Sequence, residues 1–179
     1  MSSREAGTLS GQIFMVGTGG QGILLLARAL AQIALLGGRP VISSETHGMA
    51  MRGGTVTASL KVGDYASPLI PAGSADVLIG LDEAETRGFL PMLAPGGVSV
   101  VNARTRGAFT HAIDATGMAL DAGLPGAVNM VMLGFTLRVL GIPLGQARTA
   151  VGDISPGRSL EANLEAMGLG YGHSPETAS

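Results

Sequence analysis

The sequence contains no cysteine and no tryptophan among its 179 residues. The absence of cysteine excludes disulfide bonds, cysteine-ligated zinc and ordinary iron–sulfur clusters held by this chain. Aromatic residues make up only 3% of the chain, although 46% of the residues are hydrophobic. The apolar content therefore consists mainly of Ala, Leu, Val, Ile and Met.

Charged side chains are scarce as well. Asp, Glu, Lys and Arg make up 13% of the residues, against about 25% in an average soluble domain. Either other subunits cover much of the surface, or the source genome favours Ala and Gly, and composition leaves both explanations open. A net charge of −2 and a pI near 5.9 point away from nucleic acids and anionic membranes as partners.

Long hydrophobic runs are also missing. The first ten residues lack the apolar segment that is typical of a signal peptide. The longest apolar run, Ile23–Leu36, is interrupted by Arg28 and Gln32, and it is shorter than the roughly 18 apolar residues of a membrane-spanning helix. We therefore expect no membrane association and a cytoplasmic location.

Short apolar runs of β character alternate with helical patterns along the chain. The spacing predicts strands at 12–16, 40–44, 55–62, 75–81, 98–102 and 111–114, a turn at 95–97, and helices at 23–36, 82–93, 127–140, 143–151 and 159–167. This alternation is typical of an α/β domain with a largely parallel sheet. A single domain is expected over residues 12–170, with flexible segments at 1–11 and 171–179.

A glycine-rich turn is expected between the first strand and the first helix. Gly17, Gly19 and Gly22 satisfy the pattern G-x-G-x-x-G there. The glycines allow a tight turn, and the following helix N-terminus favours an anion such as phosphate. Glu45 lies about where an acid that binds a ribose is expected. Alternatively, the turn only permits close packing of helix on sheet without a ligand, and the motif alone does not decide.

Four segments occur in an order and spacing that resemble one family. They are GTGGQGILLLARAL (17–30), ETHGMAMRGG (45–54), SPLIPAGSADVLIGLDEAE (67–85) and LAPGGVSVVN (93–102). Together with NMVMLGFTLRVLG (129–141) and a last helix containing Asn163, they resemble the gamma-type domain of 2-oxoacid:ferredoxin oxidoreductases, and most of all the beta subunit of the indolepyruvate type. Met51 departs from the family's usual Gln, which removes the amide hydrogen bonds at that position.

The resemblance implies a three-layer, Rossmann-like α/β domain that assembles with a larger subunit and is not active alone. In the family, the larger subunit carries thiamine diphosphate, magnesium and iron–sulfur clusters, coenzyme A is a co-substrate, and ferredoxin accepts the electrons. This chain fits the dependent role, because Gly63-Asp64 and Gly152-Asp153 do not continue into the G-D-G motif that holds the metal and the diphosphate. The isolated chain is expected to be able to self-associate through the surface meant for its partner.

Segment 45–54 is the candidate functional loop. Glu45 can accept a proton, His47 titrates near neutral pH, and Arg52 offers a planar fork for a carboxylate or phosphate. We expect the loop to face the larger subunit and to help close the active site around the 2-oxoacid or coenzyme A. The alternative is a structural loop in which Glu45 pairs with Arg52. The residues expected to contact a cofactor are Gly17, Gly19, Gly20, Gln21, Gly22, Gly53 and Gly54.

The remaining polar residues are weaker candidates. His111 and His173 are isolated, so no metal site is expected. The acidic group at Asp82, Glu83 and Glu85 is typical of a helix start rather than of paired catalytic carboxylates. Asn102 ends a predicted strand, where it either lines the functional edge or caps a turn.

Three functions therefore compete. The first is the small subunit of an oxidoreductase acting on indolepyruvate or another aryl 2-oxoacid. The second is a free-standing protein that binds NAD or FAD at the glycine turn. The third is a non-catalytic assembly module in which the loop has lost its role, for which Met51 is a mild indication.

Overall fold

The computed structural model describes residues 7–47, 54–155 and 157–175. In this part of the chain, six strands form one sheet in the order β2-β3-β1-β4-β5-β6. The strands are β1 (Gly11–Thr18), β2 (Val41–His47), β3 (Thr55–Val62), β4 (Ala75–Gly80), β5 (Leu93–Asn102) and β6 (His111–Ile113).

The sheet is mixed and mostly parallel, as the alternation of strands and helices predicts. Strand β1 pairs in parallel with β4, β4 with β5, and β5 with β6. Only β3 runs against the others, because it pairs antiparallel with both β2 and β1. Strands joined without a crossover helix pair antiparallel, and no predicted helix separates β2 from β3. The antiparallel strand places β2 at the edge of the sheet, two strands away from β1.

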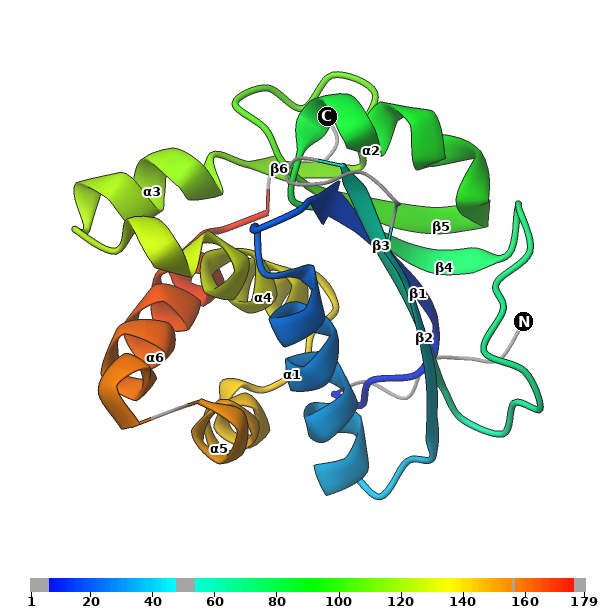
Figure 1. The fold of residues 1–179 in the computed structure, drawn as a ribbon, viewed down its shortest axis with the longest axis horizontal. Helices are drawn as coiled ribbons and strands as arrows, with labels where there is room; N and C mark the ends of the chain where they lie inside the picture. The colour runs from blue at the N-terminus through cyan, green and yellow to red at the C-terminus, as the bar shows by residue number, and fades with distance from the viewer. Residues whose placement is uncertain (1–6, 48–53, 156, 176–179) are drawn as a thin grey trace.

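Helices cover both faces of the sheet, which confirms the three-layer architecture (Figure 1). One face carries α1 and α4, with α5 and α6 packed outside them and α3 beside them (Figure 1). The opposite face carries α2 and the short 3-10 helix η1 (Figure 1). Their bounds are α1 (Ile23–Leu36), α2 (Glu83–Phe89), η1 (Leu90–Met92), α3 (Ala115–Asp121), a 3-10 helix η2 (Pro125–Ala127), α4 (Val128–Val139), α5 (Leu144–Ile154) and α6 (Gly157–Gly172).

The main hydrophobic core lies between the sheet and the layer of α1 and α4. Ile13 and Met15 of β1 point into it because alternate residues of a strand share one face, and both are fully buried. Phe14 and Val16 point to the opposite face, where they pack in a smaller cluster. The ring of Phe14 stacks on that of Phe89 from α2 at 5.5 Å between centroids. The core is thus largely aliphatic, as the composition indicates.

Packed structure extends beyond the predicted domain bounds, 12–170, at both ends of the chain. Leu9 is buried in the main core and Gly11 begins β1, so packed structure begins before the predicted boundary at residue 12. At the other end, α6 continues through Tyr171 to Gly172, where the flexible tail was expected to begin. Tyr171 packs against the main core, and the Arg138 guanidinium lies 5.9 Å from the centroid of the Tyr171 ring. These contacts explain why α6 continues into the polar segment that begins at residue 171.

Local patterns also missed two features in the second half of the chain. The turn predicted at 95–97 is an irregular part of β5, in which Gly96 has a φ of +80° and the register with β4 shifts. Helix α3 was not predicted, although Asp114 caps it by accepting a hydrogen bond from the Gly117 N–H at 2.8 Å. The bounds of α1 and β3 agree with the predictions.

Candidate functional site

The candidate site lies at the carboxyl ends of β1 and β4, the two neighbouring parallel strands in the middle of the sheet. After β1 the chain passes to α1 on one face, and after β4 it passes to α2 on the other face (Figure 1). The strand order therefore reverses between β1 and β4. In open α/β sheets, ligands bind in the crevice at such a switch point, beyond the carboxyl ends of the strands.

The glycine turn borders this crevice and is closed by one of its own side chains. The Thr18 N–H donates to Oε1 of Gln21 at 2.7 Å, and the Gln21 N–H donates to the Thr18 carbonyl at 3.2 Å. The Gly19 N–H donates to the Gly54 carbonyl at 3.0 Å. The turn therefore satisfies two of its backbone N–H groups internally, and it contacts the end of the predicted functional loop.

Two glycines of the fingerprint are required by close packing. A Cβ at Gly17 would lie 2.7 Å from Oε1 of Gln21. Gly22 has a φ of +80°, and a Cβ there would collide with the side chain of Asn129, whose Nδ2 donates to the Gly22 carbonyl at 3.2 Å. Gly20 differs, because a Cβ there would meet nothing within 4 Å. At Gly17 and Gly22 the packing explanation of the motif is thus sufficient.

Two carboxamides connect the turn to the neighbouring strand ends. Nε2 of Gln21 lies 3.4 Å from the Leu81 carbonyl, and Nδ2 of Asn102 donates to the same carbonyl at 3.1 Å. Asn102 also donates to Oγ1 of Thr116 at 2.9 Å and accepts from the Thr116 N–H at 3.2 Å. Asn102 therefore lies at the carboxyl edge of the sheet and bonds the first turn of α3, whose N-cap is Asp114.

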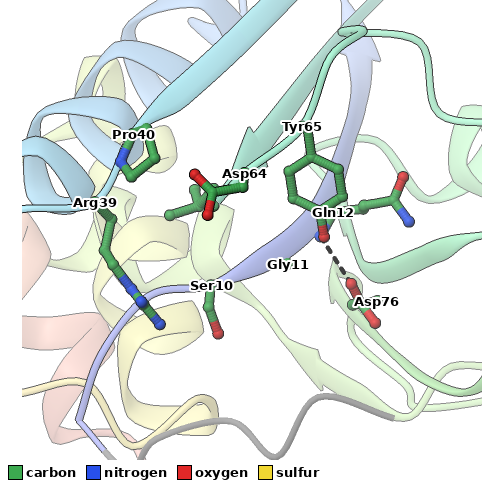
Figure 2. A pocket seen from close by; sticks show the side chains of 10 residues that line it. Ser10, Gly11, Gln12, Arg39, Pro40, Asp64, Tyr65 and Asp76 are labelled. Atoms are coloured by element: carbon green, nitrogen blue, oxygen red, sulfur yellow. Dashed lines mark hydrogen bonds between the residues drawn. The ribbon is translucent and has the colours of Figure 1, made fainter.

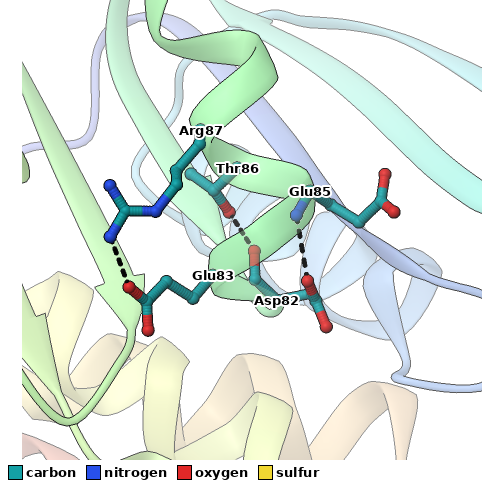
Figure 3. A network of polar contacts seen from close by, with 5 residues as sticks. All are labelled: Asp82, Glu83, Glu85, Thr86 and Arg87. Atoms are coloured by element: carbon teal, nitrogen blue, oxygen red, sulfur yellow. Dashed lines mark hydrogen bonds and ion pairs between the residues drawn. The ribbon is translucent and has the colours of Figure 1, made fainter.

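The acidic group after β4 has a structural role (Figure 3). Oδ1 of Asp82 accepts the Glu85 N–H at 3.0 Å and caps α2, while Glu83 pairs with Arg87 at 2.6 Å. Oε2 of Glu85 accepts a hydrogen bond from Oγ1 of Thr55 on β3 at 2.5 Å. The prediction of a capped helix start is confirmed. These carboxylates also place negative charge beside the crevice, which opposes the binding of a diphosphate there.

Glu45 does not occupy the position of a ribose-binding acid. It lies on β2 opposite Ala58 of β3 and is exposed. In a dinucleotide-binding fold the second strand is adjacent to the first, whereas here β3 separates β2 from β1. Neighbouring strands are about 4.8 Å apart, so the inserted strand moves Glu45 away from the glycine turn by that extra spacing.

The other residues of the predicted loop are described only in part. The backbone of His47 pairs with Val56 at the end of β2. Gly54 contacts the glycine turn through its carbonyl. Arg52 and Gly53 lie outside the described residues. The structure thus brings one end of the predicted loop to the predicted glycine turn.

Two pockets flank the glycine turn. One, of about 280 Å³, lies toward α3 and α4 and is lined by Gly20, Gln21, Leu81, Thr116, Pro125, Gly126 and Val128. The other, of about 470 Å³, lies along the first turns of α1 and is lined mostly by apolar side chains together with Arg28. Sequence reasoning missed Thr116 and the Pro125–Gly126 pair, because their place at this edge depends on α3 and η2. The Asp114 cap was the only local signal for them.

The donor atoms of this chain do not fit the cofactors that the resemblance associates with the larger subunit. No cysteine is available for an iron–sulfur cluster anywhere in the sequence. Within the described residues, no three His, Asp or Glu side chains gather in a way that could hold a metal ion. None of the helices in that part of the chain is long and apolar enough to cross a membrane.

The two isolated histidines lie at the start of β6 and just after α6. His111 begins β6, and its Nδ1 atom is buried. Burial, with a smaller contribution from the nearby Arg106, lowers the pKa of His111 below its usual value. His173 follows α6 and contacts the ring of Phe135 edge-on at 5.5 Å between centroids. Neither histidine is among the residues that line the two pockets beside the glycine turn.

Comparison with known proteins gives consistent matches over nearly the whole chain. The family model described as pyruvate ferredoxin/flavodoxin oxidoreductase matches residues 12–173. The indolepyruvate oxidoreductase subunit IorB of Archaeoglobus fulgidus is 31% identical in an alignment 186 positions long, which spans 89% of this chain and 92% of the relative. The crystal structure of the pyruvate oxidoreductase subunit PORC from Thermotoga maritima has a TM-score of 0.75 at 28% identity, covering 90% of this chain and 94% of that one.

A third similarity concerns the fold alone. The 2-oxoglutarate:ferredoxin oxidoreductase from Magnetococcus marinus, whose structure holds 2-oxoglutarate, coenzyme A and succinyl-CoA, matches with a TM-score of 0.73 at 20% identity. The match covers 89% of this chain but 30% of that one, so the same fold there forms one part of a longer polypeptide. The family match, the similarity of separate small subunits and the shared fold agree, and the chain belongs to the pyruvate ferredoxin/flavodoxin oxidoreductase family as a gamma-type subunit of a 2-oxoacid:ferredoxin oxidoreductase.

Proposed function

We propose that the carboxyl edge of the sheet docks onto a larger subunit, which supplies thiamine diphosphate, magnesium and iron–sulfur clusters. The observation that carries this proposal is the contact between Gly19 and Gly54, which joins the glycine turn and the functional loop into one surface. Oxidative decarboxylation with transfer of electrons to ferredoxin needs redox cofactors, and this chain has no cysteine that could hold an iron–sulfur cluster. The electrons pass through the larger subunit to ferredoxin, and this chain shapes the edge of the active site.

The functional loop has a specific role in this proposal. Glu45, His47 and Arg52 face the active site of the larger subunit, where a guanidinium suits the carboxylate of the 2-oxoacid or a phosphate of coenzyme A. The exposed position of Glu45 on the edge strand is compatible with this orientation. Gly17, Gly19, Gly20, Gln21, Gly22, Gly53 and Gly54 supply the backbone surface beside the loop.

The proposed substrate is indolepyruvate or another aryl 2-oxoacid. The similarity to the indolepyruvate oxidoreductase subunit of Archaeoglobus fulgidus supports it at 31% identity. The pyruvate oxidoreductase subunit of Thermotoga maritima is nearly as similar, at 28%. Overall identity therefore separates the substrates only weakly, and the choice requires a measurement on the assembled enzyme.

A free-standing NAD- or FAD-binding protein is disfavoured by three observations. Gln21 occupies the glycine turn with its own side chain, β3 keeps Glu45 away from that turn, and the carboxylates at the start of α2 oppose a diphosphate. The open space at Gly20 and the two pockets that Gly20 lines favour a ligand there. A spectroscopic search for bound nucleotide in the purified chain distinguishes the two functions.

The test uses the assembled enzyme with variants of the loop. His47→Ala and Arg52→Ala should each reduce ferredoxin reduction at least tenfold while the chain still co-purifies with the larger subunit. Arg148→Ala on α5, far from the carboxyl edge, is the matched control and should retain activity. Full activity of both loop variants would exclude the active-site role and favour the non-catalytic assembly module. The ratio of kcat/KM for indolepyruvate to that for pyruvate, measured on the same preparation, tests the substrate.

A further inference from the structure

The two outermost strands of the sheet, β2 and β6, differ in how their free sides are protected. A strand with an unpaired side offers its backbone N–H and C=O groups to any other strand, and proteins protect such strands by shortness, by Lys or Pro, or by a bulge. Strand β6 is short, with three residues. Strand β2 has seven residues, VISSETH, without Lys or Pro, and its register with β3 is regular from Val41 to His47. The outer side of β2 is therefore open to pairing along its whole length.

The described residues leave this side of β2 uncovered. In that part of the chain, β3 is the only strand that pairs with β2, and the side chains of Ser43 and Glu45 are exposed. Pro40 comes just before β2, at the rim of a pocket of about 500 Å³ between Arg39 and Asp76 at the amino edge of the sheet (Figure 2). Because proline has no N–H, pairing along the outer side of β2 begins after it.

A stripe of mostly apolar side chains on α1 lies beside the same strand. Leu24, Arg28, Ala31 and Leu35 follow each other at intervals of three or four residues, so they share one face of the helix. None of the four is buried, and Leu35 is 53% exposed. Helix α1 packs on β3 and β2 (Figure 1).

A shared pocket shows that this stripe is on the β2 side of α1. Leu24 and Arg28 line it together with Val56 of β3, and the partner of Val56 on β2 is His47. An exposed apolar stripe and an unpaired strand therefore adjoin on one side of the molecule, in a chain with only 13% charged residues. A single occupant that presents a strand and an apolar helix face covers both.

We infer that this occupant is a second copy of the chain, with β2 paired antiparallel to its own copy about a two-fold axis at Ser44. A two-fold axis perpendicular to a sheet brings the same strand of two copies together in antiparallel orientation. This continues the antiparallel β3–β2 pattern, so the two six-stranded sheets become one. The two copies of α1 then flank the paired strands on the same face, with their stripes turned toward each other.

The charges at this contact are compatible with self-pairing. With the axis at Ser44, the midpoint of β2, Glu45 is opposite Ser43 of the second copy, so like charges do not face each other. Because the two copies of α1 are antiparallel, the Leu24 end of one stripe meets the Leu35 end of the other. Arg28 and Glu45 have opposite charges, so each copy brings no net charge to the contact.

The inferred dimer goes beyond the proposed function and leaves room for it. Strand β2 is parallel to β1, because both run against β3. The two-fold axis therefore points the carboxyl edges of the two copies in opposite directions. Each copy keeps its glycine turn free for its own larger subunit, with the two small subunits at the centre of the assembly.

Sedimentation equilibrium of the full chain at tens of micromolar tests the inference. The expected mass is twice the 17.9 kDa of one chain. Ser44→Glu places two carboxylates opposite each other on the axis, and Leu35→Gln makes the stripe polar, so each should raise the Kd of the dimer at least tenfold. The matched controls are Ala122→Glu and Leu120→Gln at the exposed end of α3, where Leu120 is 58% exposed, and both should dimerise like the parent chain.

Two outcomes of this experiment overturn the inference. The first is a chain that stays monomeric, or a dimer that neither Ser44→Glu nor Leu35→Gln weakens. The second is a monomeric chain whose Ser44→Glu variant no longer co-purifies with the larger subunit, which assigns β2 to that subunit. Loss of activity in the loop variants leaves the mass unchanged, so failure of the proposed function is distinguishable from failure of the dimer.

Oxidative crosslinking locates the axis and does not depend on a disruptive variant. The chain has no cysteine, so a single introduced cysteine reports only its own position. At Ser44→Cys the two Cα atoms are about 4.5–5.5 Å apart in a paired ladder, within the reach of a disulfide. At Ser43→Cys they are more than about 7 Å apart, beyond that reach.

The expected result is at least fivefold more covalent dimer for Ser44→Cys than for Ser43→Cys or for the exposed control Ala122→Cys. Preference for Ser43→Cys supports the same pairing with the axis one residue earlier. Equal yields at positions 44, 43 and 122 overturn the pairing of β2.

Discussion

Gln21 shows at the scale of one residue how a glycine turn can satisfy one of its own backbone N–H groups. An anion-binding turn presents its backbone N–H groups to the ligand. Here Oε1 of Gln21 accepts a hydrogen bond from the Thr18 N–H at 2.7 Å, and Nε2 of the same side chain approaches the Leu81 carbonyl. The glycines in the sequence predicted the turn. The contact of the Gln21 side chain with the Leu81 carbonyl could not be predicted, because it depends on where β4 ends.

Gln21→Ala should destabilise the chain by about 1–2 kcal/mol, because the partly buried Thr18 N–H and Leu81 carbonyl each lose a partner. Urea unfolding of the isolated chain measures this. Gln32→Ala is the matched control on the same segment, since its amide bonds Asp153 in an exposed position, and it should change stability by less than about 0.5 kcal/mol. Equal losses in the two variants would argue against a role for Gln21 in closing the turn.

The position of His111 predicts that the stability of the chain depends on pH. Its pKa is lowered in the folded chain, first by burial and then by Arg106, so the unfolded chain binds more protons as the pH falls through about 6.5. Stability therefore decreases between that pH and the lower folded pKa, and it is unaffected by this group at higher pH. His111→Asn should lose less stability than the parent chain between pH 7.5 and pH 5 in urea unfolding. Parallel pH profiles would contradict this.

At the scale of elements, α4 and α6 are held at close range by two facing glycines. A Cβ at Gly134 of α4 would overlap the Met167 carbonyl of α6, and a Cβ at Gly170 of α6 would overlap the Val131 carbonyl of α4. The contact is reciprocal, so each helix backbone occupies the space beside the other's glycine. This packing forms the outer part of the helical layer and buries Met167 and Val131 completely.

Gly134→Ala and Gly170→Ala should each destabilise the fold by about 1–3 kcal/mol or more, because α4 and α6 must separate to admit the methyl group. Gly168→Ala, on α6 but with nothing within 4 Å of the new Cβ, should instead stabilise by up to about 1 kcal/mol through helix propensity. Thermal unfolding of the three variants provides the comparison. Destabilisation by Gly168→Ala equal to that of the other two would argue against the close packing of α4 and α6 as the cause.

The elements were predictable where one segment carried its own signal. The apolar run of α1 ended by glycines, and the β-branched alternation of β3, gave the observed bounds. The local signals failed where contact with a distant segment determined the secondary structure. Pro95–Gly97 has the composition of a turn, yet it lies within β5 because the start of β4 pairs beside it. Tyr171 has polar neighbours in sequence but belongs to α6 because Arg138 and the core contact it.

At the scale of the whole molecule, the two edges of the sheet have different chemistry. The carboxyl edge carries the glycine turn, the carboxamides of Gln21 and Asn102, and the capped start of α2. The amino edge carries the charged pocket between Arg39 and Asp76. On the proposed function, we expect the larger subunit to cover the carboxyl edge and not the amino edge.

Hydrogen exchange of the isolated chain and of the assembled enzyme tests this arrangement. Backbone amides at 19–24 and 81–86 should exchange at least tenfold more slowly in the complex, because docking excludes water from the carboxyl edge. Amides at 63–74, on the loop beside the charged pocket, provide the internal control and should be unchanged. Protection confined to 63–74 would move the docking surface to the amino edge.

The sequence by itself determined the fold class and the family, because these follow from periodicity and ordered motifs, and its lack of cysteine excludes an iron–sulfur cluster held by this chain. It also predicted a glycine turn at 17–22, which the structure places in contact with Gly54 at the end of the predicted loop. The tertiary structure decided that β3 lies between β1 and β2, which separates Glu45 from the turn. It also decided that Arg39 and Asp76, far apart in sequence, share one pocket. Both outcomes depend on strand order, which is set by pairing between distant segments and has no local signal in the chain.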